Sequence, residues 1–488
     1  MTDFILYIVI LVQIIIFLYF LFVNGSYTIL TFFSLFDIRG QLAVASKQYI
    51  NELSTGTFYR PISIIVPAYN EEKTIIASLE NLLTLSFPEY EIIVVNDGSS
   101  DETLQRIIAN FSMIEVERPL SLRLPHEPIR GQYVSLRNPN LTLIDKENGG
   151  KADALNVGIN ASRFPLFCSM DADSLLEGDA LTRASKLFVE DREIIATGGI
   201  IRVLNGCSVD GGRISSVKTP RRFIECFQSV EYVRGFLTGR TSWNSFNSLL
   251  IISGAFGIFR KDMVMEIGGY RRSVGEDMDL VVRLHRHCCK EKIPYKIHFV
   301  PDPVCWTQVP NDYLSLLKQR NRWHRGLIDS LRFSRGMLFN PRYGKVGMVG
   351  IPYFILIEAL GPAIEFLGYL SFVIFFFFGY LNREFAMLFL LVSVLWGMWL
   401  NVASIMLDNL IYRRYHSVWD LVKLSIFGVL EFAGYRQLIS VERLIATFTF
   451  WRTEWGKAKR HKLDNHTDGK EPPKLSLMQR LTTLFTIK

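Results

Sequence analysis

Long uncharged segments at both ends of the chain constrain its fold more than any other feature. Phe4 to Val23 carries no charge and is long enough to cross a bilayer. Val349 to Phe450 is a series of apolar runs separated by short charged turns. Between them lies a stretch of ordinary α/β composition, so the whole chain is 49% hydrophobic and only 21% charged. The sequence therefore predicts a soluble domain flanked by membrane segments.

The distribution of charge indicates how the membrane segments are oriented. The formal net charge is +7, and basic residues such as Arg413 and Arg414 gather beside apolar runs rather than on a basic face with interleaved aromatics. Nucleic acid is therefore not an expected partner. Arg39 and Lys47 follow the first apolar run, while Met1 to Asp3 has no basic residue, so we expect a retained anchor and a cytosolic middle domain. Six cysteines without Cys-x-x-Cys spacing agree with a reducing compartment.

The middle region follows a βαβ pattern. Ile62 to Val66 predicts a buried strand ended by Pro67, Glu72 to Leu85 a helix, and Glu91 to Val95 a second strand. Parallel strands bind ligands at their carboxyl ends. The loop residues that follow these two strands are therefore candidates for substrate binding: Ala68, Tyr69, Glu71 and Asp97.

A third strand, Leu166 to Met170, runs directly into Asp171 and Asp173. Side chains alternate along a strand, so both carboxylates can face the same way and share one divalent cation. Turn chemistry is the alternative for Asp-x-Asp, and an Asx turn that caps the next helix is the alternative for Asp97. The convergence of three loops on one edge favours a site.

Lys151 follows Gly149-Gly150 at a predicted helix start, after the short strand Leu141 to Ile144. The Walker pattern fails, because no glycine stands four positions earlier and no Ser or Thr follows the lysine. A lysine at a helix start opposes the helix dipole unless an anion binds there. Lys151 thus predicts a pyrophosphate contact, with a solvated lysine as the alternative. No Gly-x-Gly-x-x-Gly follows a strand, so no nicotinamide cofactor is expected.

Two later segments add candidate residues. Ser253 and Gly254 end an apolar strand, where small residues permit the close approach of something bulky. Glu276 and Asp277 open a predicted helix, and acidic residues there are either caps or, in a pocket, a catalytic base.

The region from Asn311 to Leu327 predicts an amphipathic helix. Gln319, Arg322 and Trp323 share one face at three- and four-residue spacing. They offer a phosphate donor beside a flat aromatic platform suited to a sugar ring. An interfacial anchor just before the membrane spans is the alternative.

Four motifs in one order carry a resemblance. Asp97, Asp171-Ala172-Asp173, Gly275-Glu276-Asp277 and Gln319-Arg320-Asn321-Arg322-Trp323 resemble the motifs of membrane-embedded, processive family two glycosyltransferases, among them the cellulose, chitin, hyaluronan and poly-N-acetylglucosamine synthases. The likeness covers roughly residues 60 to 330 in detail. It implies a GT-A domain with a Rossmann-like mixed α/β sheet, fused to transmembrane and interfacial helices. The usual Thr before the Glu-Asp pair is Gly275 here, which puts one hydroxyl contact in doubt.

The resemblance also implies a role for each candidate. Tyr69, Glu71 and Asp97 would hold uridine, and Lys151 the nucleotide sugar. Asp171 and Asp173 would contact ribose and a Mg²⁺ or Mn²⁺ ion. Asp277, next to Glu276, would be the catalytic base, because the metal would keep the other two carboxylates ionised. Gln319, Arg322 and Trp323 would hold pyrophosphate and acceptor, and Ala68, Ser253 and Gly254 complete the substrate-binding set.

The implied activity is inverting, processive transfer from a UDP-activated hexose or N-acetylhexosamine, with export of the β-linked polysaccharide across the inner or plasma membrane. The implied partners are the UDP-sugar, the growing glycan, membrane lipid, and accessory export or regulatory proteins. Two alternatives stay open, a non-processive transferase acting on a lipid-linked acceptor and an inactive membrane receptor or scaffold. We expect a membrane anchor at 1–38, a linker at 39–60, the cytosolic catalytic domain at 61–340, membrane and interfacial helices at 341–452, and a basic tail at 453–488.

The carboxyl-terminal apolar region predicts several spans. Tyr353 to Phe378 is broken by Gly361-Pro362, Ala386 to Leu407 forms another span, and Val418 to Ala433 is marginal in length. Glu358 and Glu365 lie within apolar sequence, where they are costly facing lipid. We expect them either to touch a translocating glycan or to bond between helices. The segment from Trp451 to Lys457 resembles a gating segment in its placement, with a lipid-interface anchor as the alternative.

Overall fold

A mixed sheet of ten strands forms the centre of the fold in the computed structural model, which describes residues 2–52, 59–121, 123–380, 382–415 and 417–451. The spatial order of the strands is β3-β4-β5-β2-β1-β6-β11-β8-β12-β7. Their bounds are β1 Ile62–Ala68, β2 Tyr90–Asp97, β3 Met113–Glu115, β4 Ile129–Ser135, β5 Leu141–Lys146, β6 Leu166–Met170, β7 Ser174–Leu176, β8 Ile194–Val203, β11 Phe256–Arg260 and β12 Lys296–Thr307. β9 (Ser208–Asp210) and β10 (Arg213–Ser216) form a separate hairpin.

Four neighbouring strands, β5, β2, β1 and β6, run parallel, so their carboxyl ends meet at one edge as predicted. The prediction that β1 ends before Pro67 is wrong, since the strand continues to Ala68. β6 pairs with β1 only as far as Ile65, so a proline two residues later leaves no hydrogen bond to β6 unmade.

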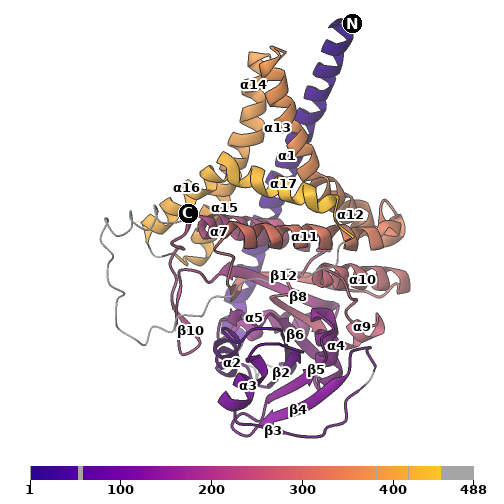
Figure 1. Cartoon of the computed structure of the whole chain (residues 1–488), viewed down its shortest axis with the longest axis vertical. Coiled ribbons are helices and arrows are strands. Elements are labelled where there is room, and N and C mark those ends of the chain that lie inside the picture. Colours follow the sequence, from indigo (N-terminus) through magenta and orange to yellow (C-terminus); the bar gives the residue numbers. More distant parts are fainter. Residues whose placement is uncertain (1, 53–58, 122, 381, 416, 452–488) are drawn as a thin grey trace, which may run out of the picture.

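Helices cover the sheet and connect it to the apolar region (Figure 1). In the figure α1, α13 and α14 extend away from the sheet at the top, and α11, α16 and α17 lie between them and the sheet. The helices before the apolar region are α2 Ile75–Leu83, α3 Thr103–Asn110, α4 Lys151–Ala161, α5 Ala180–Ser185, α6 Leu187–Glu190, α7 Phe223–Tyr232, α8 Gly239–Thr241, α9 Lys261–Glu266, α10 Glu276–Glu291 and α11 Tyr313–Phe333. Those at either end of the chain are α1 Thr2–Glu52, α12 Ile351–Tyr353, α13 Gly361–Phe377, α14 Arg383–Leu390, α15 Trp396–Tyr412, α16 Val418–Leu430 and α17 Arg436–Thr447.

Two helices among the described residues are long and apolar enough to span a membrane, Tyr7–Gly40 and Arg383–Tyr412. A third span is formed if the pair Val346–Ala359 and Gly361–Phe377, bent by 40°, counts as one. The bend lies at the predicted Gly361-Pro362 break. α1 continues well past Val23 to Glu52, so part of the segment expected to be a linker is helical. α16 is not among the candidate spans in the described part of the chain.

The two glutamates within apolar sequence are paired with cations from α17. Glu358 accepts from Arg443, 3.3 Å from its Oε2, and from the Tyr27 hydroxyl at 3.2 Å. Glu365 is buried, bonds to Arg436 and accepts from the Ser440 hydroxyl at 2.7 Å. Pairing within the bundle offsets the cost of placing these carboxylates in an apolar region.

The mixed α/β sheet followed by apolar helices confirms the predicted fold class. α11 is longer than expected, because its helical pattern continues beyond Leu327 to Phe333. The predicted gating segment and the basic tail lie, apart from Trp451, outside the described residues.

Candidate active site

The acidic pair lies at the end of β6, whose residues are all buried between β1 and β11. Asp171 follows the strand with a side chain that is 33% exposed. Asp173, one residue before β7, is 4% exposed. The fully buried strand is therefore followed by one partly exposed carboxylate, Asp171, and one buried carboxylate, Asp173.

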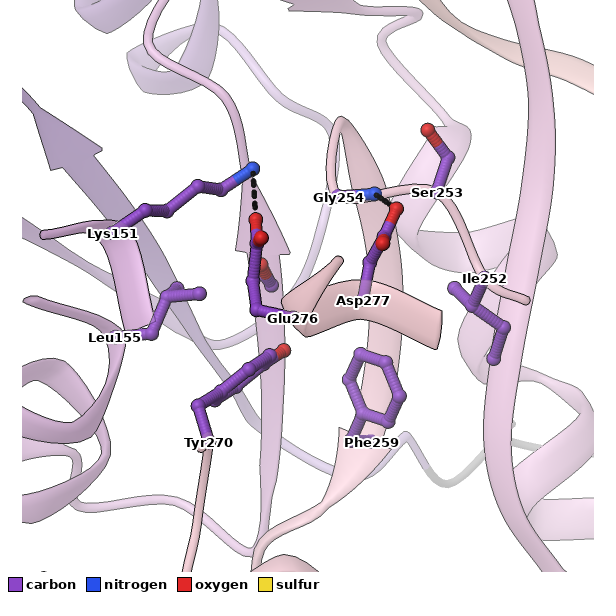
Figure 2. A pocket seen from close by; sticks show the side chains of 10 residues that line it. Lys151, Leu155, Ile252, Ser253, Gly254, Phe259, Tyr270, Glu276 and Asp277 are labelled. Carbon is purple, nitrogen blue, oxygen red and sulfur yellow. Dashed lines mark hydrogen bonds and ion pairs between the residues drawn. The ribbon is translucent and has the colours of Figure 1, made fainter. Parts of the chain in front are cut away.

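Lys151 connects this pair to α10. Its ammonium Nζ lies 2.5 Å from Oδ1 of Asp171 and 3.3 Å from Oε1 of Glu276, the second contact being drawn in Figure 2. Burial works to lower the pKa of Lys151, but the carboxylates of Asp171 and Glu276 outweigh it, so the pKa is raised. The site consequently keeps a positive charge at the start of α4, where the sequence predicted a helix to begin.

Glu276 and Asp277 stand side by side at the start of α10. Oδ2 of Asp277 accepts from the Gly254 amide at 3.3 Å, and its Oδ1 accepts from the Met278 amide at 2.8 Å. Glu276 is buried, and burial, reinforced by Asp277, raises its pKa against the opposing effect of Lys151. The two acidic residues thus differ in surroundings, one enclosed beside an ammonium and the other held by amides at the pocket wall.

Ten residues line this pocket, and nine of them are labelled in Figure 2. They are Lys151, Leu155, Ser169, Ile252, Ser253, Gly254, Phe259, Tyr270, Glu276 and Asp277. A Cβ on Gly254 would lie 2.6 Å from Nζ of Lys151, so the group for which the small residue makes room is the lysine itself. Tyr270 is a pocket residue that the sequence analysis missed; its position just after Gly268-Gly269, ahead of the Glu-Asp pair, was the available signal.

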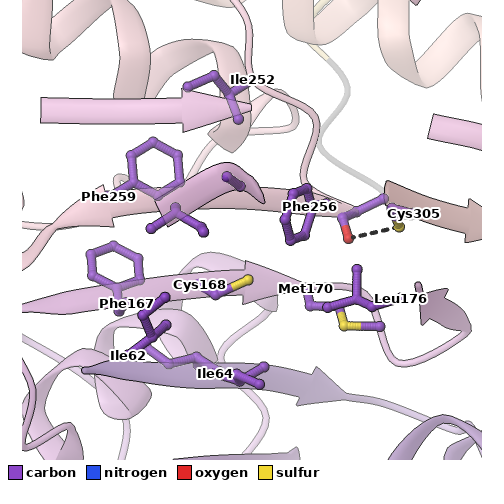
Figure 3. Close-up of a cluster of buried hydrophobic side chains, with 14 of the residues drawn as sticks. Ile62, Ile64, Phe167, Cys168, Met170, Leu176, Ile252, Phe256, Phe259 and Cys305 are labelled. Atoms are coloured by element: carbon purple, nitrogen blue, oxygen red, sulfur yellow. Dashed lines mark hydrogen bonds between the residues drawn. The ribbon is translucent and has the colours of Figure 1, made fainter. Parts of the chain in front are cut away.

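Packed aromatic rings support the pocket from below. Phe167 of β6 and Phe259 of β11 stack with centroids 5.4 Å apart and ring planes 24° apart. Figure 3 shows both rings together with Ile252. Cys305 of β12, on the same sheet, donates a hydrogen bond to the Ala255 carbonyl. Close packing of this kind fixes the strand ends that carry the acidic residues.

The loops after β1 and β2 are bonded to each other at the predicted edge. The Asn70 amide donates to the Ser99 hydroxyl at 3.0 Å, and the Ser100 amide donates to Oδ1 of Asn70 at 2.8 Å. Tyr69 is 45% exposed and available to a ligand, whereas Ala68 is buried. Glu71 is also buried and accepts from the Thr74 hydroxyl at 2.8 Å.

Asp97 is more enclosed than the sequence suggested. It is 3% exposed. Its carboxylate accepts from Nζ of Lys146 at 2.6 Å and from the amides of Gly149 and Gly150 at 2.9 and 2.8 Å. Asp101, not Asp97, accepts from the Thr103 amide at the start of α3.

The predicted aromatic and cationic face of α11 lies close to the pocket. Arg322 is near enough to lower the pKa of Glu276, against the larger effect of burial. Trp323 is 45% exposed, and the Arg320 guanidinium lies over its ring at 4.3 Å. Arg320, which the sequence analysis did not single out, is buried, pairs with Glu231 at 2.5 Å and donates to Gln319.

The residues present fit a divalent cation. Asp171 and Asp173 supply hard oxygen donors from one strand end, the ligands that Mg²⁺ and Mn²⁺ prefer. In the described part of the chain no three acidic, histidine or cysteine side chains gather to hold a metal by themselves. Two carboxylates suit an ion whose remaining ligands are substrate phosphates and water.

Two known protein families match parts of the chain that contain candidate site residues. Residues 63–118 match glycosyl transferase family 2, and residues 166–400 match glycosyl transferase family group 2. The first match ends within the loop region after β3, and the second begins at β6, contains Asp171, Asp277 and Trp323, and ends in α15. Residues 63–118 and 166–400 of the chain are therefore similar to glycosyl transferase family 2 domains.

Several curated proteins are similar to part of this chain. The chain is 29% identical over 267 residues to the poly-beta-1,6-N-acetyl-D-glucosamine synthases of Staphylococcus epidermidis and Staphylococcus aureus. Each alignment covers 54% of this chain and 54% of the relative, so the chain spans about half the length of the curated relatives it matches. Over that part of its length the chain is similar to poly-beta-1,6-N-acetyl-D-glucosamine synthases.

Solved structures show weaker likeness. A mannosyltransferase from Pyrobaculum calidifontis, solved with GDP-Man and Mn²⁺, aligns with 86% of this chain and 99% of its own at 18% identity and a TM-score of 0.48. Residues 1–349 of TarS from S. aureus, solved with UDP-GlcNAc, align with 77% of this chain and 92% of their own at 15% identity and a TM-score of 0.36. We draw no conclusion from likeness at this level.

Proposed function

We propose that this protein is an inverting, processive glycosyltransferase that polymerises a UDP-activated hexose or N-acetylhexosamine into a β-linked exopolysaccharide and passes it across the membrane. One observation carries the proposal: Lys151 of α4 lines one pocket with Glu276 and Asp277 of α10, and its ammonium also pairs with Asp171 at the end of β6. The relatives' product makes UDP-N-acetylglucosamine the first donor to test.

Asp277 is the proposed catalytic base. The acceptor hydroxyl oxygen bonds to the anomeric carbon, the bond from that carbon to the UDP phosphate oxygen breaks, and the hydroxyl proton passes to Asp277. The Gly254 amide bonded to Oδ2 orients the carboxylate for this transfer. Lys151 and Arg322 supply positive charge for the departing phosphates, so catalysis rests on positioning and electrostatic stabilisation.

Asp173 and Asp171 are proposed to hold Mg²⁺ or Mn²⁺. When bound, the ion would neutralise charge on the phosphates. Asp171 would then exchange part of its bond with Lys151 for the ion, which would leave the ammonium available to the donor phosphates.

The remaining contacts are proposed from the placement of the exposed groups. Exposed Tyr69, which follows β1, and the buried Ala68 and Glu71 on either side of it are proposed for the nucleoside, and Ser253 in the pocket is proposed for the rest of the donor. Trp323, exposed on α11 beside Gln319, suits stacking on a sugar of the acceptor.

Export would use the membrane helices that follow the catalytic domain. We propose domain boundaries at 60, 340 and 452. The catalytic domain would be cytosolic, and the chain would cross the inner or plasma membrane several times. Glu358 and Glu365, with their partners on α17, supply polar groups along the bundle. Any accessory export proteins would be separate from these membrane helices.

Measurement of UDP release and product length by full-length protein in detergent, with a panel of UDP-sugars and Mn²⁺, tests the proposal. Wild type should release UDP and form long products; single additions would favour the non-processive alternative, and no release with any donor would favour a scaffold. Asp277→Asn should lower turnover by about 10²–10⁴-fold while UDP affinity stays within about threefold. Asp210→Asn, at an exposed site on β9, is the matched control. An Asp277→Asn protein that still elongates polymer at the wild-type rate contradicts the base assignment.

A further inference from the structure

A fully buried lysine lies at the end of β5, next to the candidate site but outside its pocket. Lys146 is 0% exposed. Its ammonium Nζ is 2.6 Å from Oδ1 of Asp97, 2.6 Å from Oδ1 of Asp153 and 2.5 Å from the Glu147 carbonyl oxygen. The ammonium donates hydrogen bonds to Asp97 and to the Glu147 carbonyl oxygen, and it forms an ion pair with Asp153.

The partner of this lysine holds the next loop residues. Besides Lys146, Asp97 accepts from the Gly149 amide at 2.9 Å and the Gly150 amide at 2.8 Å. The Asn148 side-chain amide donates to its Oδ2 at 3.2 Å and to its carbonyl oxygen at 2.7 Å. Successive amides that converge in this way form an anion-binding concavity, and in this chain the anion is Asp97 itself.

The same loop is tight on its other side. A Cβ on Gly149 would lie 2.5 Å from Cγ of Asp153, and Gly150 has a φ of +90°, which favours glycine. Asp153 also accepts from the Glu127 amide at 3.1 Å. The segment between β5 and α4 is thus held by charge, amide bonds and steric fit, and the residue that follows it is Lys151.

We propose that Lys146 is a positioning residue. Together with Asp97 and Asp153 it clamps the loop Glu147–Gly150, and this places the ammonium of Lys151 next to the carboxylates of Asp171 and Glu276. Asp97 holds the loop because its buried carboxylate is bonded both to Lys146 and to the two loop amides. The proposal rests on the proposed function for its consequence, donor binding, but the clamp itself is a property of the fold.

Hydrogen–deuterium exchange of full-length protein tests the clamp without any substrate. In Lys146→Met the amides of Gly149 and Gly150 should exchange at least about tenfold faster than in wild type, because their acceptor is released. Lys290→Met, which removes an exposed lysine from α10, should leave these amides unchanged. Unchanged exchange in Lys146→Met overturns the proposal.

Affinity for UDP measured by calorimetry tests the consequence. Lys146→Met and Asp97→Asn should each weaken UDP binding by about tenfold or more, and the double variant should bind no worse than the weaker single variant, because either change already frees the loop. Asp97 is a direct ligand instead if Asp97→Asn loses UDP while Lys146→Met binds like wild type. If a single variant does not fold, the double variant, in which positions 146 and 97 are both neutral, carries both measurements. Wild type without UDP affinity would refute the proposed function, whereas the exchange rates would still decide on the clamp.

Discussion

Lys151 is the residue whose replacement tests the site most directly. It is the ammonium that faces three carboxylates, Asp171, Glu276 and Asp277, all of which act to raise its pKa. Lys151→Met keeps the length of the side chain and removes the charge. Glu276 and Asp277 in the pocket and Asp171 beside it would then lack their shared ammonium, and the site would have to bind a donor whose phosphates are also negative.

Two costs can be worked out from this geometry. Removing one partner of a buried ion pair costs about 3–5 kcal/mol, and the side chains of Lys151 and Glu276 are only 17% and 7% exposed. The enzyme can avoid part of that cost by protonating Glu276, whose pKa burial already raises and Lys151 now holds down. Removing one preorganised donor to a developing anion costs a further factor of about 10²–10³ in rate. We therefore expect kcat/KM to fall by about 10²–10³-fold.

Initial rates of UDP release between pH 5.5 and 9 provide the assay. Lys151→Met should show both the lower rate and an acid limb moved to higher pH, because the loss of Lys151 raises the pKa of Glu276 further. Lys151→Arg should keep the charge but recover only part of the rate, since a guanidinium is larger and differently shaped. A Lys151→Met protein within about threefold of wild type, with an unmoved pH profile, would refute the reasoning.

Two further predictions concern stability and the placement of α10. His285 is fully buried between Tyr295 and the Leu249 carbonyl, and burial lowers its pKa from 6.5 to about 4. The stability that the neutral ring confers is therefore complete above pH 6.5. It is lost as the pH falls towards 4, and the loss amounts to about 3 kcal/mol. Thermal unfolding at pH 7 and pH 4.5 should show a smaller acid loss for His285→Gln than for wild type, and an equal loss would contradict this. A Cβ on Gly275 would lie 2.8 Å from the Gly326 backbone, so Gly275→Ala should displace α10 and lower turnover by about 10²-fold with UDP affinity retained, as measured by UDP release and calorimetry; unaltered turnover would show that the contact can relax.

Much of the fold follows from patterns that act over a short range. The apolar strand Leu166 to Met170 lies where its uninterrupted hydrophobic run predicts it, and the parallel strands around it bring the acidic loops to one edge. Lys151 opens α4 and Asp277 lies in the first turn of α10, since helix starts have local signals. The strand and the two helix starts are each indicated by residues within a few positions of them in the sequence.

The features that the sequence did not predict depend on partners far along the chain. The enclosure of Asp97 requires Lys146 to fold back against it, and Arg320 is buried because Glu231, 89 positions earlier, lies opposite it. Neither pairing has a periodicity or spacing that a single sequence displays. Tyr270 follows Gly268-Gly269, which indicates a turn ahead of the Glu-Asp pair, but its place beside Ser169 of β6 and Lys151 of α4 depends on the tertiary fold.

The contact between Gly275 and Gly326 explains the one departure from the family pattern. α11 passes so close to the start of α10 that a Cβ on either glycine would meet the other's backbone within 3 Å. The threonine that usually precedes the Glu-Asp pair would therefore not fit, and the absent hydroxyl contact is exchanged for direct contact between the helix that carries Asp277 and the helix that carries Trp323. Since α11 also packs on α17, a shift of the apolar helices would reach the carboxylate at the pocket through two rigid elements. The helix that carries Asp277 is thus in backbone contact with α11, and α11 packs on α17.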